Sequence, residues 1–164
     1  MRGSLFLLLA ALLMSSACRR LPDVQGSGAP FLQGVWKQDS IAHADRLLNY
    51  TEHMFKFTCD SFYIEMTTHS KVNYYEDSCY HNGLWREYAK GTYRVRSDTI
   101  FLLGTYTKAN YKQKISGCYQ IGQYIKGFKI LESRKDSLIL ESTENQRELR
   151  LLLKTPIKCV PQPL

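Results

Sequence analysis

Residues 55–66 read FKFTCDSFYIEM, and this stretch decides the fold class. On both sides of Cys59-Asp60, apolar side chains alternate with polar ones, which is the period-two pattern of a half-buried β-strand. An aspartate side chain hydrogen-bonds to the backbone two residues further on and so favours a turn. The stretch therefore predicts two antiparallel strands joined by a tight turn at Asp60.

The same turn chemistry recurs twice further along the chain. Ser97-Asp98-Thr99-Ile100 and Lys135-Asp136-Ser137-Leu138 also place an aspartate before a hydroxyl residue and an alternating apolar run. Each of these aspartates lies 38 residues after the one before it. The segments between them do not align, as those of a repeat protein would. The pattern therefore predicts recurring β-hairpins and not a solenoid.

Strand-like alternation continues in YRVRSDTIFLLGTY (93–106) and SLILES (137–142). Residues 40–50, SIAHADRLLNY, follow Asp39, which is a good helix N-cap, and they predict a short helix or a long first loop. About nine strands and one short helix, without βαβ alternation, imply an all-β fold. Its antiparallel sheet is either closed on itself or packed on a second sheet.

The N-terminus has the pattern of an export signal. Arg2 precedes an uncharged apolar run over residues 5–14, which is too short to span a bilayer as a helix. Residues 15–18, SSAC, resemble the lipobox of bacterial lipoproteins, with Ser15 where leucine is commonest. In such proteins the cysteine is acylated, and each buried CH2 contributes about 0.8 kcal/mol to membrane attachment. We therefore expect Cys18 to be lipidated, the alternative being an ordinary signal peptide with a chance cysteine.

Composition divides the chain into four segments. We predict a lipoprotein signal peptide over residues 1–17, a lipidated tether over 18–30, a β-barrel domain over 31–154 and a proline-rich tail outside the sheet over 155–164. Arg19 follows the anchor in place of the aspartate that retains lipoproteins in the inner membrane. The expected location is therefore the outer membrane of a bacterial envelope, facing the periplasm.

The chain has five cysteines, an odd number for an exported protein. With Cys18 as the anchor, Cys59, Cys79, Cys118 and Cys159 remain, and an oxidising envelope favours two disulfides. Three pairings are possible, and the sequence does not choose among them. Our prediction is Cys79 with Cys118 and Cys59 with Cys159, the second holding the C-terminal tail to the body of the domain.

The chain carries a formal net charge of +7. After signal cleavage, 21 basic and 15 acidic residues remain, with the basic residues dispersed singly. A basic surface attracts anionic lipid head groups, whereas dispersed charges in an exported protein do not predict nucleic-acid binding. The expected partners are the membrane, through the anchor, and a small ligand or another envelope protein.

Residues 32–37, LQGVWK, resemble the Gly-x-Trp that opens the first strand of lipocalin-like barrels. In that family the tryptophan closes the floor of the barrel, and an arginine from the last strand packs on it. The resemblance implies a lipocalin-like barrel of about eight to nine strands, closed by Gly34 and Trp36. It also implies a cation–π contact to the Trp36 ring from Arg147 or Arg150.

Three stretches are similar to a group of short, uncharacterised bacterial lipoproteins: FKFTCDSFYIEM (55–66), SKVNYYEDSCYHNGLWREYAKGTYRV (70–95) and KQKISGCYQIG (112–122). Some members of that group carry the name fumarate hydratase, which implies a lyase or hydratase activity. The iron-free fumarases share a Gly-Ser-Ser-x-Met-Pro-x-Lys-x-Asn loop that supplies a catalytic serine. The only Ser-Ser of this chain is Ser15-Ser16, in the predicted signal peptide. No motif for that chemistry therefore accompanies the resemblance.

Eleven tyrosines are the most distinctive feature of the composition. Aromatic side chains with a polar end suit a ligand pocket or a protein interface, and they also fill the interior of a small barrel. His81 lies two residues after a cysteine, but this pair lacks the spacing of zinc sites, so we expect neither a metal nor a cofactor. The ligand-binding candidates lie over residues 74–88: Tyr74, Tyr75, Tyr80, His81, Trp85 and Tyr88.

These patterns predict a lipid-anchored envelope binding module. It would hold a small apolar or amphipathic ligand, or a partner envelope protein, on its aromatic surface. One alternative is an enzyme of lyase or hydratase type that uses His81 and a nearby acid for proton transfer. Another is a purely structural envelope lipoprotein.

Overall fold

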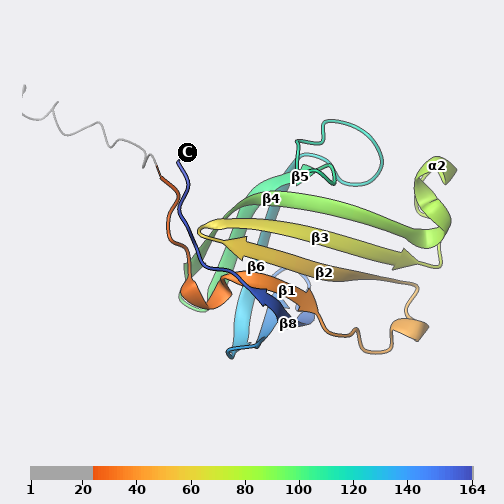
Figure 1. Cartoon of the computed structure of the whole chain (residues 1–164). Helices are drawn as coiled ribbons and strands as arrows, with labels where there is room; N and C mark the ends of the chain where they lie inside the picture. Colours follow the sequence, from red (N-terminus) through yellow and green to blue (C-terminus); the bar gives the residue numbers. More distant parts are fainter. Residues whose placement is uncertain (1–23, 164) are drawn as a thin grey trace, which may run out of the picture.

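The alternating segments form eight antiparallel strands in the computed structural model, which describes residues 24–163 (Figure 1). Each strand pairs with the next, and β8 pairs with β1, so the sheet closes into a barrel. This confirms the predicted all-β antiparallel barrel and excludes two packed sheets. The strands are β1 (Gly34–Gln38), β2 (Asn49–Thr58), β3 (Ser61–Ser70), β4 (Leu84–Arg96), β5 (Thr99–Thr107), β6 (Gln123–Ser133), β7 (Ser137–Ser142) and β8 (Glu148–Pro156).

Only short helices lie in the described connections. The predicted helix over residues 40–50 is wrong, and the alternative of a long first loop is confirmed. Asn49 and Tyr50 already belong to β2, because they pair with Ser70 and His69 of β3. Cross-strand pairing thus outweighs the helical spacing of this segment. The short helices are the α-helix α2 (Asp77–Tyr80) and the 3-10 turns η1 (Pro30–Leu32), η2 (Ala44–Arg46) and η3 (His81–Gly83).

The predicted signal peptide over residues 1–17 and the anchor Cys18 lie outside the described residues, as does the tether up to Asp23. Over residues 24–163, no helix is both long enough and apolar enough to cross a bilayer.

Three tight turns gather at one end of the barrel, which we call the closed end. They are Cys59-Asp60, Ser97-Asp98 and residues 134–136. In a meander every second turn returns to the same end, so turns that recur along the sequence lie together in space. All three contain the aspartates that predicted hairpins, and those hairpins are confirmed. The opposite end, which we call the mouth, carries the longer loops 39–48, 71–83, 108–122 and 143–147.

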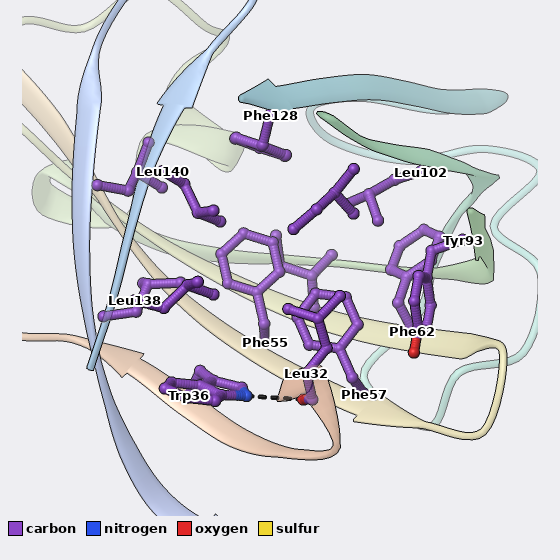
Figure 2. Packing of buried hydrophobic residues seen from close by; sticks show 14 of the residues in the cluster. Leu32, Trp36, Phe55, Phe57, Phe62, Tyr93, Leu102, Phe128, Leu138 and Leu140 are labelled. Carbon is purple, nitrogen blue, oxygen red and sulfur yellow. Dashed lines mark hydrogen bonds between the residues drawn. The ribbon is translucent and has the colours of Figure 1, made fainter. Parts of the chain in front are cut away.

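Apolar side chains fill the barrel toward its closed end (Figure 2). Phe55 and Phe57 are fully buried, with ring centroids 5.7 Å apart, and the Phe57 ring meets the edge of Tyr93 at 5.1 Å. Leu32 of η1 is also fully buried and accepts a 2.8 Å hydrogen bond from Trp36 Nε1 at its carbonyl oxygen. Burying one such side chain stabilises the fold by roughly 1.5–3 kcal/mol. The closed end therefore holds a large share of the hydrophobic core.

Trp36 lies at the floor of this core, and Gly34 leaves room for Leu153 beside it. A Cβ at Gly34 would lie 2.5 Å from Leu153 Cδ1. The predicted contact of an arginine with the Trp36 ring is wrong. Side chains alternate along β8, so Arg150 faces outward and pairs with Glu148 at 2.6 Å. Arg147 precedes β8 in a mouth loop, at the opposite end of the barrel from η1.

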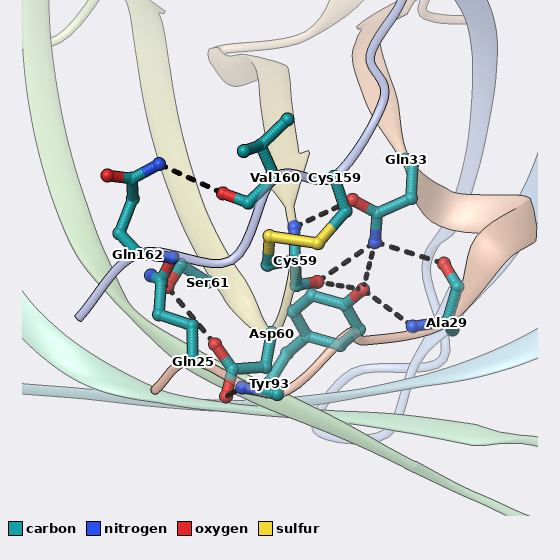
Figure 3. Close-up of a disulfide and its surroundings, with 11 residues drawn as sticks. Gln25, Ala29, Gln33, Cys59, Asp60, Ser61, Tyr93, Cys159, Val160 and Gln162 are labelled. Carbon is teal, nitrogen blue, oxygen red and sulfur yellow. Dashed lines mark hydrogen bonds between the residues drawn. A yellow bond between two sulfur atoms is a disulfide. The ribbon is translucent and has the colours of Figure 1, made fainter. Parts of the chain in front are cut away.

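The two terminal segments are tied to the closed end and to each other (Figure 3). The predicted disulfide between Cys59 and Cys159 is present, with Cα atoms 4.8 Å apart. Gln25 N–H donates to Gln162 O at 3.0 Å, and Ala29 N–H donates to the Tyr93 hydroxyl at 3.0 Å. Residues 24–29, which we call the N-terminal strap, are the described part of the predicted tether and are held against the barrel.

The C-terminal tail also departs from its prediction. Thr155 and Pro156 pair with Val35 and Gly34, so β8 runs two residues past the predicted boundary at Lys154. Pro156 ends the strand, where its missing N–H costs no ladder hydrogen bond.

Candidate functional site

Period-two alternation continues from the core toward the mouth, but the inward side chains there are polar. The side chain of His53 points to the same side of β2 as that of Phe55, and the side chain of Lys126 points to the same side of β6 as that of Phe128. These side chains line a cavity of about 220 Å³. Its apolar floor is formed by Met66, Phe128 and Leu149, and its polar walls include Thr51, His53, Thr68, Glu87, Lys126, Ser142, Glu144 and Arg147.

Two of the charged groups in this mouth cavity are paired. Lys126 Nζ lies 2.5 Å from Glu144 Oε2, which joins β6 to the loop before β8. Glu87 Oε1 accepts a hydrogen bond from Gln120 N–H at 2.9 Å, which joins β4 to the loop 108–122. The walls therefore present both charge signs and many hydrogen-bonding groups, which suits a polar or charged ligand group better than a purely apolar ligand.

His53 is held as a neutral ring in the wall of the cavity. Burial and the nearby charge of Arg147 lower the pKa of His53 from 6.5 to about 4. The backbone N–H of His53 donates to Gln38 Oε1 at 3.1 Å, and His53 Nδ1 lies 3.0 Å from the same oxygen. Because that oxygen accepts, Nδ1 carries the ring proton, and Nε2 is the acceptor that remains for a ligand.

Two tyrosines complete the inner wall. Tyr106 and Tyr124 meet edge to face with ring centroids 5.4 Å apart. Burial raises the pKa of Tyr106 to about 12, with the charges of Glu87 and Glu144 adding to the effect. Burial also raises the pKa of Tyr124. Both hydroxyls are therefore protonated at neutral pH and can donate hydrogen bonds.

A second hollow opens beside the mouth cavity, along the loop between β1 and β2. This outer groove has a volume of about 600 Å³, and Ile41, Ala42 and Leu47 give it an apolar side. Arg147 and His53 line both hollows, so the two meet at these side chains. Together they offer a polar interior and an apolar outer surface to one amphipathic molecule.

The predicted aromatic surface is divided among different places. Tyr75 and Trp85 do come together, joined by Tyr119, whose ring stacks on Trp85 at 4.9 Å. The predicted disulfide between Cys79 and Cys118 joins the loops that carry Tyr75 and Tyr119, with Cα atoms 5.5 Å apart. We call loops 71–83 and 108–122 the stapled loops. They form a rim at the mouth and contact its cavity through Gln120.

The other predicted ligand residues lie apart from this cluster. Tyr88 faces the outside of the sheet and packs against Tyr111, at 6.0 Å between centroids. Tyr80 donates to Ser70 O at 3.2 Å and so supports its own loop. Tyr74 and His81 are exposed. The acid–base interpretation needs an acid beside His81. Within residues 24–163, His81 makes no side-chain hydrogen bond or ion pair with an acid.

The predicted ligand-binding residues do not include those that line the cavity, above all His53, Glu87, Lys126 and Arg147. The sequence does carry a signal for three of them. His53, Glu87 and Lys126 lie an even number of residues from buried residues of the same strand, so their side chains point into the barrel. In the part of the chain that the structure describes, no three His, Cys, Asp or Glu side chains are grouped to hold a metal ion.

We compared the chain with protein-family models, with curated proteins and with solved structures, and nothing matched it. The site is therefore interpreted from its own geometry.

Proposed function

We propose that this protein is a lipid-anchored binding module of the bacterial outer membrane, facing the periplasm, which holds a small amphipathic ligand at the mouth of its barrel. The observation that carries the proposal is that the barrel interior is divided into an apolar core and a polar cavity. The core fills the closed end, whereas the inward side chains at the mouth leave a polar cavity that continues into an apolar-sided groove. Pockets with a few convergent polar groups beside apolar surface are typical of ligand sites.

The first test is native mass spectrometry of the mature protein, purified from a bacterial envelope. We expect added mass that disappears on denaturation, because a cavity lined by charged groups favours a bound partner. Protein without added mass, from several preparations, would contradict a retained ligand and turn the search toward protein neighbours.

A pair of substitutions locates the ligand. Thr68 lines the cavity, whereas the preceding Thr67 faces outside on the same strand. We expect Thr68→Phe to fill the cavity and reduce the ligand-bound fraction at least tenfold, because overpacking leaves no room for the ligand. Thr67→Phe is the matched control and should retain it. Equal retention by both variants, each shown folded by circular dichroism, would place the ligand elsewhere.

The anchor has its own test. Globomycin blocks cleavage of lipoprotein signals, so the uncleaved precursor should accumulate in treated cells. Cys18→Ser should abolish acylation, because it removes the thiol to which the lipid is attached. Normal processing under globomycin would remove the anchor from the proposal and leave the binding site standing.

A further inference from the structure

Arg147 lies where the mouth cavity meets the outer groove, since its side chain lines both. Its backbone is fixed in the loop before β8. Arg147 N–H donates to Asn145 Oδ1 at 3.1 Å, and Arg147 O accepts from Ser142 N–H at 2.9 Å. The loop therefore fixes the backbone of Arg147 at this junction through hydrogen bonds to its main-chain atoms.

Three cationic side chains line the two hollows, and two of them already have a carboxylate partner. Lys126 pairs with Glu144, and Arg150 pairs with Glu148. Over residues 24–163, Arg147 forms no ion pair. It is thus the cation at the site that is left to bind an anion.

The surroundings of Arg147 limit the charge of that anion. His53 lines the same junction as a neutral ring, so it adds no second positive charge at neutral pH. Glu87, Glu144 and Glu148 line the neighbouring walls and repel further negative charge. A guanidinium binds the two oxygens of one carboxylate in a planar, bidentate geometry. One unpaired guanidinium among these carboxylates therefore favours a monoanion over a phosphate dianion.

The apolar side of the outer groove defines the rest of the ligand. Ile41 and Leu47 line the groove beside Arg147. We propose that Arg147 binds the carboxylate of an amphipathic monoanion, whose apolar part lies against Ile41 and Leu47. This inference rests on the proposed binding function and names the chemical class of the ligand.

The test compares three compounds with alkyl chains of nine or ten carbons and different head groups: decanoate, decan-1-ol and decyltrimethylammonium. Affinities for the mature protein are measured by isothermal titration calorimetry below the micelle concentration. We expect decanoate to bind at least tenfold more tightly than decanol, because a charge-assisted pair is stronger than a neutral hydrogen bond. The cationic compound should bind most weakly.

Variants assign the preference to one side chain. Arg147→Gln should reduce decanoate affinity about tenfold and leave decanol affinity unchanged, while Arg147→Lys should lose part of the preference because it lacks the bidentate fork. Lys154→Gln is the control, because it removes the same charge from the closed-end half of β8. Unchanged thermal unfolding shows that each variant is folded.

The outcomes separate this inference from the proposed function. Equal affinity for decanoate and decanol, or tightest binding of the cation, would overturn the role of Arg147 and leave a binding cavity in place. Binding of none of the three compounds would overturn the amphipathic site itself, and the proposed function with it.

Discussion

At the scale of single residues, His53 links the stability of the barrel to pH. Its pKa is about 4 in the folded protein and 6.5 ordinarily, because of burial and the charge of Arg147. The unfolded chain therefore takes up the proton first as the pH falls. The stabilisation is complete above pH 6.5 and is lost progressively between pH 6.5 and 4, by up to about 3 kcal/mol.

Urea unfolding at pH 7, 5.5 and 4.5 measures this effect. His53→Gln should show a smaller loss of unfolding free energy over that range than the unchanged protein, since glutamine does not titrate. His81→Gln is the control at an exposed position and should keep the original slope. Parallel pH profiles for the unchanged protein and His53→Gln would contradict the burial of a neutral His53.

Gly28 is a second residue whose role depends on close approach. Its φ is +66°, and a Cβ there would lie 1.8 Å from Cys59 O. Gly28→Ala should therefore displace the N-terminal strap and lower the free energy of unfolding by about 2 kcal/mol or more. Gly122 has a φ of +85° but open space around it, so Gly122→Ala should cost only about 1 kcal/mol of backbone strain. Equal costs in urea unfolding would mean that the strap is not packed on the Cys59 turn.

At the scale of elements, the Cys79–Cys118 disulfide holds the stapled loops together. Cys79→Ser/Cys118→Ser should raise amide hydrogen exchange over residues 72–82 and 109–121 and lower the free energy of unfolding by roughly 2–4 kcal/mol. The barrel strands should keep their relative protection, because their ladders do not depend on this bond. Exchange in the two loops should stay low when Cys59 and Cys159 are replaced instead. Unchanged exchange in the loops after removal of their own disulfide would contradict their coupling.

The elements also show where sequence reasoning succeeds. The hairpin turns at Asp60, Asp98 and Asp136 were predictable, because turn chemistry and alternation act over a few neighbouring residues. The local pattern left a short helix or a long loop open for residues 40–50, and the pairing of Tyr50 with His69 is a contact that this pattern does not encode. Of the predicted aromatic site, Tyr75 and Trp85 do come together, and Tyr119, which the prediction did not include, packs on both from another loop.

At the scale of the whole molecule, the strap sets the orientation that a lipid anchor would impose. Hydrogen bonds hold the chain at Gln25, Gly26 and Ala29 to the closed end. Only five residues, 19–23, separate Cys18 from Val24, and even a fully extended chain over these six steps spans roughly 20 Å. If Cys18 carries the lipid anchor that we propose, the closed end should face the membrane and the mouth should point away from it.

A fluorophore attached at either end of the barrel measures this orientation. Lys135→Cys places the label in the closed-end turn, and Asn145→Cys places it in a mouth loop. In vesicles that carry nitroxide-labelled head groups, the lipidated protein should show at least twofold stronger quenching at position 135. Equal quenching at both positions would contradict a membrane-facing closed end, whereas an unlipidated control should show no quenching at either.

The sequence by itself determined the all-β class and the closed-end hairpins, because side-chain alternation and turn chemistry are local properties. It reduced the cysteine pairing to three alternatives, and the fold places Cys59 beside Cys159 and Cys79 beside Cys118. Only the tertiary structure decided which side chains form the site. Closure of the barrel brings His53, Lys126 and Arg147 from distant parts of the chain into one cavity. Lys126 has a carboxylate partner there and Arg147 has none over residues 24–163. That difference depends on distances through space, which no local pattern encodes.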